Sequence, residues 1–505
     1  MRLEMTISYR TEWGQSLFLR CGDRLYPLEY SPGDKWVGAI DRLTPGQTLE
    51  YRYEVHRNGL CERTEWESHR LTLPSGRGVK SFEVTDWWSD VPQDLPLHSA
   101  PFRSGVFSVE PGRAWRAAGT AVPVFSLRSE QGFGIGEFND LKALVDWAAA
   151  TGQKVIQLLP VNDTTMTGTW EDSYPYNANS SFALHPQFVH LPAAGVAEDE
   201  EYLRLRDELN SLPEVDYERV NNEKRRLLRK TFASNGKRTL SSKGYREFLE
   251  RSRSWLLPYA AFCTLRERFG TADFTLWKTP EKDYSVYDEA LAEELASTCG
   301  KELDFHCFVQ YHLHLQLLEA RDYAHSKGVI FKGDLPIGVS RTSADAWVDS
   351  RLFHLDSQAG APPDAFSAQG QNWGFPTYDW EEMSKDGYAW WKSRLSCMSE
   401  YFDAFRIDHV LGFFRIWEIP MSAVHGILGH FSPALPYSSE ELGRLGFDMA
   451  DPRYSCPCLD DRHISGVFGD LADEAKSRFI ADGRLKSAYS TQRKVLEKLR
   501  GNEPD

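Results

Sequence analysis

Four short apolar runs separated by helical segments constrain the fold of this chain more than any other feature. The runs cover residues 121–127, 154–160, 329–337 and 402–409. They do not alternate apolar with polar residues, and strands of this type are buried on both faces of a parallel sheet. Segment 140–150, between the first two runs, repeats apolar residues at helical spacing. Strand and helix in alternation predict an α/β fold, and polar residues just after the strands are typical of a (β/α)8 barrel.

The chain is expected to be multidomain, because 505 residues exceed the length of one ordinary domain. Residues 1–90 contain short β-prone runs separated by turns, which predicts a β-sandwich. Prolines at positions 92, 96 and 101 mark residues 91–114 as a linker. The remainder is predicted to hold about the first four barrel strands at 115–420, a charged helical insertion at about 195–300, and an insertion-like segment at 421–505.

Charge and composition narrow the classes of partner. The net charge of −15 argues against nucleic acid, and no concentrated basic surface is evident. The eight cysteines are scattered, so we expect reduced thiols and no metal or organic cofactor. No run of about 18 apolar residues occurs, and the first residues lack the apolar core of a signal peptide. These features predict a cytoplasmic protein without membrane contact that acts on a neutral substrate.

The last apolar run delivers Arg406, Asp408 and His409 to the end of its strand. Side chains alternate along a strand, so those of Arg406 and Asp408 project to the same side. A guanidinium in that position keeps a carboxylate ionised and fixes its orientation, as a carboxylate nucleophile requires. Taken alone, the pair is also consistent with a structural ion pair.

The loops after the second and third runs combine carboxylates, amides and aromatic rings. Tyr176 follows the second run, in a segment stiffened by Pro175. Carboxylates and amides bind sugar hydroxyl groups and aromatic rings stack on sugar faces, so we expect a glycan-binding cleft. A packed structural loop is the alternative for the tyrosine segment. After the third run, a long loop rich in Gly and Pro contributes Asp334, Asp364, Gln371 and Trp373.

The order of these segments resembles glycoside hydrolase family 77, the 4-α-glucanotransferases, across residues 119–420, most specifically from Gly333 to Phe414. Leu159-Pro160-Val161-Asn162-Asp163 is most similar to the branch of plant cytosolic disproportionating enzymes. The resemblance implies retaining transfer of α-1,4-glucan segments or glucosyl units between maltooligosaccharides, glycogen or starch-like α-glucans. It implies that Asp408 is the nucleophile, that Arg406 is its charge partner, and that His409 binds the sugar. The resemblance also implies that five residues line the substrate cleft, namely Tyr176, Asp334, Asp364, Gln371 and Trp373.

The N-terminal region resembles a family 20 carbohydrate-binding module, a starch-binding domain that the same branch carries. The similarity rests on Trp36, the strand around Arg52, and the segment around Trp66. It implies that Trp36 and Trp66 stack on glucose rings and that Arg52 contacts sugar. The alternative is that these tryptophans belong to the core of the sandwich.

The chain departs from the family pattern after residue 420. The family's acid/base Glu segment and its third carboxylate have no counterpart, and we interpret Glu440 and Glu441 as part of a helix start. We therefore expect a C-terminally truncated front half of a larger enzyme, with low or no activity by itself. Three functions remain open: a 4-α-glucanotransferase, which we prefer, a catalytically inactive α-glucan-binding fragment, and an α-glucan hydrolase.

Overall fold

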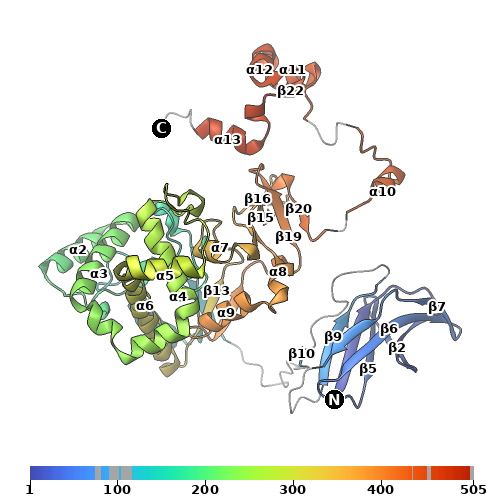
Figure 1. Ribbon diagram of the computed structural model, residues 1–505, viewed down its shortest axis with the longest axis horizontal. Helices are drawn as coiled ribbons and strands as arrows, with labels where there is room; N and C mark the ends of the chain where they lie inside the picture. Colours follow the sequence, from blue (N-terminus) through green and yellow to red (C-terminus); the bar gives the residue numbers. More distant parts are fainter. Residues whose placement is uncertain (74–80, 90–101, 104–116, 435, 452–456, 501–505) are drawn as a thin grey trace. The chain divides into compact units, whose positions relative to one another are not determined.

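The computed structural model describes residues 1–73, 81–89, 102–103, 117–434, 436–451 and 457–500. Its contacts divide the chain into two units, Met1–Trp115 and Arg116–Asp505 (Figure 1). Apart from β10 (Phe102–Arg103), the predicted linker 91–114 lies outside the described residues. Each unit has hydrophobic core residues of its own.

The N-terminal unit consists of two five-stranded sheets, which confirms the expected sheet-rich region. One sheet has the order β10-β9-β1-β5-β4, and the other has β3-β2-β6-β7 with β8 also paired to β6. Alternate residues of β1, such as Leu3 and Met5, join Leu17 and Leu19 of β2 in one core. The strands are β1 (Arg2–Ser8), β2 (Gln15–Cys21), β3 (Arg24–Pro27), β4 (Glu29–Ser31), β5 (Lys35–Ile40), β6 (Thr48–Arg57), β7 (Leu60–Thr64), β8 (His69–Thr72) and β9 (Ser81–Asp86).

The second unit contains the predicted parallel sheet, with strands in the order β11-β12-β13-β18. All three neighbouring pairs in it are parallel. The first strand is shorter than the predicted 121–127, because Pro123 precedes a 3-10 turn at Val124–Ser126. The four strands are β11 (Gly119–Val122), β12 (Val155–Leu158), β13 (Ile330–Leu335) and β18 (Ala404–Ile407).

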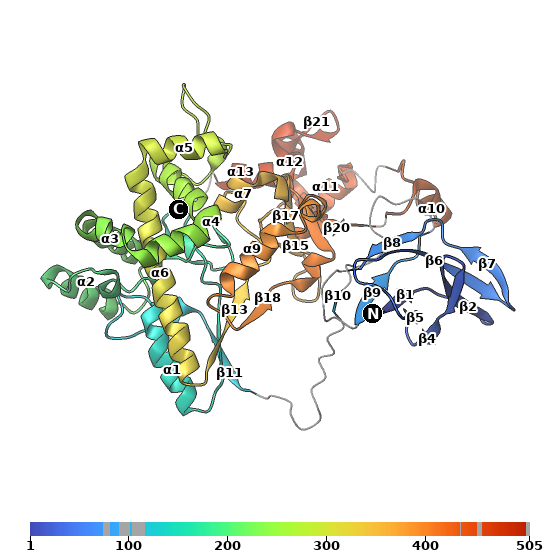
Figure 2. The same cartoon turned by 60° about the horizontal axis from the view of Figure 1, so that its bottom comes forward.

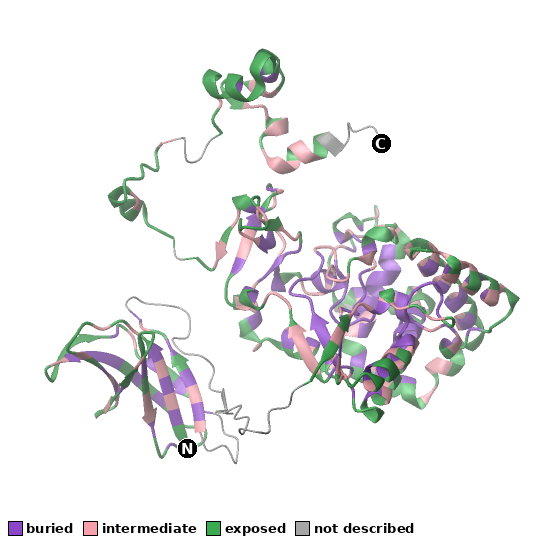
Figure 3. Ribbon diagram, turned by 180° about the vertical axis from the view of Figure 1, so that it is seen from behind, coloured by how far each residue is buried: buried purple, intermediate pink, exposed green. Residues whose placement is uncertain are grey.

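Helices between these strands cover part of the sheet, and the edge strands β11 and β18 stay only partly buried, unlike the expectation of burial on both faces. Helix α1 (Leu141–Ala150) directs Leu141, Val145 and Ala148 into the same core as the strands, as the helical spacing predicts. Helix α6 (Gly300–Ser326) is buried on every side over residues 305–311, because the insertion covers the face that the sheet does not (Figure 3). Helices α8 (Trp380–Lys385) and α9 (Ala389–Met398) precede the fourth strand.

The insertion between β12 and β13 is mostly helical, as expected (Figure 1). Its long helices α3 and α4 both pack against α6. Side-chain oxygens cap all four of its helices at the N-terminus, namely those of Asp199, Asp216, Ser242 and Asp288. The insertion comprises α2 (Glu200–Ser211), α3 (Tyr217–Leu240), α4 (Lys243–Phe269) and α5 (Glu289–Thr298).

The long loop expected after the third strand has secondary structure of its own. Its strand β15 pairs antiparallel with β19 (Ile416–Pro420), which therefore joins a separate sheet, β16-β15-β19-β20, rather than the parallel one. This pairing brings together segments separated by more than fifty residues, which local sequence patterns do not reveal. The elements are α7 (Ala344–Val348), β14 (Phe353–His354), β15 (Ser357–Ala361), β16 (Gln371–Asn372), β17 (Thr377–Tyr378) and β20 (His430–Ser432).

The segment after residue 420 is partly anchored to that sheet. Arg493 donates through Nε to the carbonyl of Met421 at 2.6 Å and through Nη2 to Gln358 of β15 at 2.9 Å. Among the described residues, no helix combines the length and apolar character that crossing a bilayer requires. The segment contains α10 (Ser439–Arg444), α11 (Asp461–Phe468), α12 (Ala472–Phe479), β21 (Ile480–Ala481), β22 (Arg484–Leu485) and α13 (Gln492–Arg500).

Candidate active site

The candidate site forms where β13 and β18 end. In this parallel pair, Asp334 of β13 stands opposite Arg406 of β18. Because both strands run the same way, their carboxyl ends meet at one edge of the sheet and present these side chains together. Asp408 follows directly, and its backbone amide donates to the carbonyl of Leu335 at 3.1 Å, which continues the pairing by one step.

Arg406 binds two carboxylates at once. Its Nη1 donates to both oxygens of Asp334, each at 2.7 Å, and its Nη2 donates to Oδ1 of Asp408 at 2.7 Å. The prediction that Arg406 and Asp408 project to the same side is therefore confirmed. Tyr176 completes the cluster from the loop after β12, because its hydroxyl donates to Oδ2 of Asp334 at 2.8 Å.

Burial differs between the two carboxylates and gives them different properties. The side chain of Asp334 is fully buried, whereas that of Asp408 is 30% exposed. Burial raises the pKa of Asp334, while the Tyr176 hydroxyl and the Arg406 guanidinium act in the opposite direction. Burial, followed by the hydrogen bond to Asp334, raises the pKa of Tyr176 to about 12, so this hydroxyl remains a donor at neutral pH. Asp408 is thus the carboxylate that a ligand can reach.

His409 and Trp373 form the aromatic side of the cluster. His409 has a left-handed backbone with a φ of +43°, a rare conformation for a residue other than glycine that is typical of functional sites. Its ring lies edge-on to Trp373, with centroids 4.7 Å apart. Burial lowers the pKa of His409, so the imidazole is neutral at neutral pH. The indole of Trp373 donates to Gln371 Oε1 at 3.0 Å, which places Gln371 beside the same ring.

Asp364 is the cleft residue for which the structure shows no contact with this cluster. It is exposed, and its Oδ1 accepts from the amides of Phe366 and Ser367 at 2.9 and 2.8 Å. These bonds are typical of an Asp that stabilises its own turn. A role in sugar binding remains a prediction for this residue.

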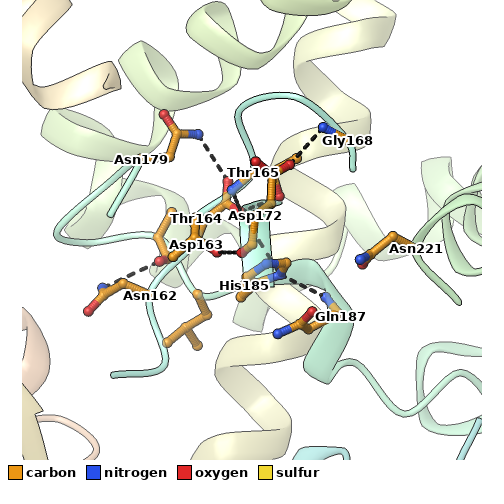
Figure 4. Close-up of polar contacts among 12 residues, drawn as sticks. Asn162, Asp163, Thr164, Thr165, Gly168, Asp172, Asn179, His185, Gln187 and Asn221 are labelled. Atoms are coloured by element: carbon orange, nitrogen blue, oxygen red, sulfur yellow. Dashed lines mark hydrogen bonds and ion pairs between the residues drawn. The ribbon is translucent and has the colours of Figure 1, made fainter. Parts of the chain in front are cut away.

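A buried polar cluster holds the loop that carries Tyr176 (Figure 4). Asp163, just after β12, is completely buried and accepts from Thr165 Oγ1 at 2.6 Å, Asn179 Nδ2 at 3.1 Å and Tyr259 at 2.8 Å. Burial opposes ionisation, but His185, Arg266 and the bonds from Thr165 lower the pKa of Asp163 below its ordinary value. An anionic anchor therefore fixes both ends of the loop. Asp163 has no role among the sequence-based expectations, although a polar Asn162-Asp163 pair directly after a buried strand is the signal that marks it.

The N-terminal residues predicted to bind sugar fall into two groups. Trp36 is only 6% exposed and belongs to the core, with Tyr30 packed edge-on against it. Its ring has no free face for a glucose ring, so the expected stacking role of Trp36 is corrected to a structural one. Trp66 is 65% exposed, and Arg52 is also exposed.

Glu440 and Glu441 belong to a helix start, as interpreted. Ser438 accepts from the amide of Glu441, and Glu441 accepts from the amide of Ser438 at 2.8 Å, which together form a capping box on α10. Both glutamates are exposed. Among the described residues, Asp334 and Asp408 are the carboxylates that bind Arg406.

One group of potential metal ligands occurs in the N-terminal unit. Glu54, His56 and Cys61 place ligand atoms within 4.8 Å of one another. However, Glu54 already accepts from two nitrogens of Arg20, and His56 Nε2 lies 2.8 Å from its second oxygen. A cation here would have to displace Arg20, so the arrangement is that of an ion pair.

Comparison with known proteins agrees with this geometry. Residues 122–492 match the family of 4-alpha-glucanotransferases, glycoside hydrolase family 77. The chain is 43% identical over 402 residues to 4-alpha-glucanotransferase DPE2 of Oryza sativa subsp. japonica, covering 77% of this chain and 42% of that protein. It is 35% identical over 342 residues to a 4-alpha-glucanotransferase of Chlamydia muridarum, covering 66% of this chain and 59% of that protein.

The fold is also shared with a solved structure, that of the amylomaltase from Streptococcus agalactiae in complex with acarbose. The TM-score is 0.56 at 24% identity, over 77% of this chain and 86% of the amylomaltase. The chain spans about half the length of the two curated relatives named above, 42% and 59%. Since the family match covers most of the second unit, the chain belongs to the 4-alpha-glucanotransferase family, glycoside hydrolase family 77.

Proposed function

We propose that the chain is a 4-α-glucanotransferase that transfers α-1,4-glucan segments or glucosyl units between maltooligosaccharides, glycogen or starch-like α-glucans. The observation that carries the proposal is the Arg406 guanidinium shared by Asp334 and Asp408, at 2.7 Å from each. It keeps Asp408 oriented, and the Asp408 side chain has the exposure that a nucleophile needs. Family membership supplies the reaction class.

In the proposed mechanism, Asp408 attacks the anomeric carbon of the donor sugar. A C–O bond forms between the carboxylate and the sugar as the glycosidic bond breaks, and the leaving oxygen takes up a proton. The 4-hydroxyl of an acceptor sugar then attacks the same carbon, releases Asp408 and returns a proton to the group that protonated the leaving oxygen. His409 and Trp373 would hold the sugar at the reacting position, and Tyr176 with Asp334 would keep Arg406 in place.

The proton donor is the part of this mechanism that the cluster does not supply. Asp334 accepts hydrogen bonds from both Tyr176 and Arg406, so its oxygens are engaged as acceptors. A second carboxyl group about 5 to 5.5 Å from the nucleophile is required for natural substrates, whose leaving oxygen must be protonated. A donor with fluoride as its leaving group has no such requirement, which separates the two steps experimentally.

The experiment compares maltotriose with α-glucosyl fluoride as donor, in the presence of a maltooligosaccharide acceptor. We expect the wild-type chain to release fluoride and to form elongated products, and Asp408→Asn to do neither. A ladder of longer products from maltotriose as well would show that the chain also has a working proton donor. Fluoride release from glucosyl fluoride without longer products from maltotriose would show that the chain performs the nucleophilic step alone.

Failure of both donors would contradict the proposal. Retention of maltooligosaccharides by the inert chain would then favour a glucan-binding protein without turnover. Release of glucose to water without elongated products would favour a hydrolase.

We further propose that the parallel sheet is the first half of a (β/α)8 barrel and that the N-terminal unit binds α-glucan. The strand order β11-β12-β13-β18, with polar residues at the carboxyl ends, supports the barrel. Trp66, with 65% exposure, supports the binding role, because an exposed indole is available for stacking. A cytoplasmic location fits the free thiols of the described cysteines.

A further inference from the structure

A pocket separate from the Asp408 cluster lies between α4, α7 and α9. These three helices come from distant parts of the sequence and lie beside one another in both views (Figures 1 and 2). The pocket has a volume of about 230 Å³. Its lining includes Phe182, Trp255, Asp345 and Trp390, and it does not include Tyr176, Asp334, Trp373, Arg406 or Asp408.

Aromatic rings form the walls of this pocket. Trp255 of α4 stacks on Phe182 with centroids 6.1 Å apart and planes 14° from parallel. Trp390 of α9 meets the same Phe182 ring edge-on at 6.2 Å. Phe182 is buried, whereas both tryptophans are half-buried, so each keeps part of its surface open to the pocket. Two partly open indoles around a third ring form an apolar surface suited to the C–H face of a pyranose.

Carboxylates and hydroxyls complete the pocket. Asp345 is 8% exposed, and its Oδ2 accepts from the amide of Ser181 at 2.6 Å. Asp349 and Asp386 lie nearer the solvent, and burial, aided by the charge of Asp386, raises the pKa of Asp349. Carboxylate oxygens are strong acceptors for hydroxyl groups, and a sugar presents several hydroxyl groups around an apolar ring.

The charges around the pocket favour a neutral ligand over a cation. Arg394 is fully buried, lies 5.6 Å from the ring of Trp390 and 4.7 Å from that of Trp391, and so already occupies the position of a cation beside these indoles. Burial raises the pKa of Asp345 to about 6, so this carboxyl is still mostly ionised at neutral pH and can accept hydrogen bonds from a ligand. Three carboxylates in the lining would repel an anionic ligand such as a sugar phosphate.

We propose that this pocket is a second sugar site, which binds one neutral pyranose ring between Trp255 and Trp390 with Asp345 as acceptor. The size agrees, because pockets for drug-sized ligands are larger, about 300–1,000 Å³. The site adds a binding function that is independent of the chemistry at Asp408. It is connected to that cluster through the chain, because Ser180 and Phe182 follow Tyr176 in the same loop.

The test uses Asp408→Asn labelled with 5-fluorotryptophan, so that ligands bind without turnover. Single substitutions assign the fluorine resonances. Trp255→Phe and Trp390→Phe identify those of the pocket, and Trp373→Phe identifies that of the proposed cleft. We expect glucose and maltose to shift the Trp255 and Trp390 resonances saturably. The resonance of Trp147, a half-exposed indole on α1 outside the pocket, should not move.

Asp345→Asn provides the matched variant. Loss of a charged acceptor weakens binding about tenfold, so the Trp255 and Trp390 shifts should need roughly ten times more glucose. The titration of the Trp373 resonance should stay unchanged. A merely structural effect of the substitution would move the Trp147 and Trp373 resonances as well.

Other outcomes overturn the proposal. If neither pocket resonance responds to glucose or maltose while Trp373 does, the second site is absent and the proposed transferase stands. If tetramethylammonium shifts the pocket resonances and the sugars do not, the pocket binds cations. If the pocket responds to sugar but glucosyl fluoride is inert with the wild-type chain, the second site stands and the proposed transferase fails.

Discussion

Arg406 contacts two carboxylates, and each depends on it for a different reason. Asp334 is buried, and a buried carboxylate is costly unless it is paired. Asp408 is partly exposed, and needs orientation more than neutralisation. One planar guanidinium serves both because its two Nη atoms point in different directions. A lysine, with a single nitrogen, cannot reach both in the same geometry.

The first prediction is that Arg406→Lys slows fluoride release from α-glucosyl fluoride. Loss of a hydrogen bond to a charged group costs about 1.5–3 kcal/mol, so we expect a decrease in rate of roughly 10- to 100-fold. The control is Arg57→Lys, since Arg57 also bridges two carboxylates, Glu12 and Glu62, but on the surface of the other unit. An unchanged rate in Arg406→Lys would mean that Arg406 is only a structural ion-pair partner.

The second prediction concerns pH and Tyr176→Phe. Burial raises the pKa of Asp334 and the Tyr176 hydroxyl lowers it, so removal of the hydroxyl should raise this pKa further. Protonated Asp334 no longer attracts Arg406, so activity is lost as the pH falls through the pKa of Asp334. The acidic limb of the rate profile with glucosyl fluoride should therefore move to higher pH. Tyr174→Phe, in the exposed neighbour, should leave the limb in place.

Among the elements, the parallel strands were the most predictable from sequence. Each is an unalternated apolar run, which is typical of a parallel sheet, although the edge strands β11 and β18 are only partly buried in the structure. The antiparallel sheet around β15 was not predictable, because β15 has the sequence Ser-Gln-Ala-Gly-Ala, without β-branched residues, and owes its pairing to distant β19. The Arg406–Asp408 pair followed from strand alternation. The contact of Asp334 with this pair could be known only from the register between β13 and β18, which places Asp334 opposite Arg406.

The third prediction tests the packing of β13 against β18. A Cβ at Gly333 would lie 2.6–2.9 Å from ring atoms of the buried Phe402, which lies just before β18 in the chain. Overpacking of this kind costs about 1–3 kcal/mol, so Gly333→Ala should lower the midpoint of thermal unfolding. Activity should also fall, because Asp334 is the next residue. Gly300→Ala is the control, since nothing lies within 4 Å of its added Cβ; equal midpoints for the two variants would refute the packing argument.

At the scale of the whole molecule, two units with separate cores use tryptophan in two different ways. Trp36 fills the core of the N-terminal unit, whereas Trp66 extends from its surface. Composition alone cannot distinguish these uses, because it counts both tryptophans alike. Burial distinguishes the structural role of Trp36 from the surface position of Trp66, and substitutions in the full chain can test this difference.

The fourth prediction is that Trp36→Ala lowers the stability of the N-terminal unit, whereas Trp66→Ala weakens glucan binding without loss of stability. Loss of a buried tryptophan costs about 3–5 kcal/mol, so Trp36→Ala should unfold the N-terminal unit at lower temperature while the transition of the second unit stays in place. Trp66→Ala should leave both calorimetric transitions unchanged and weaken retention on amylose. Intact retention in Trp66→Ala would exclude this indole as a sugar platform. A single transition that shifts as a whole in Trp36→Ala would show that the two units unfold together, because independent cores lose stability independently.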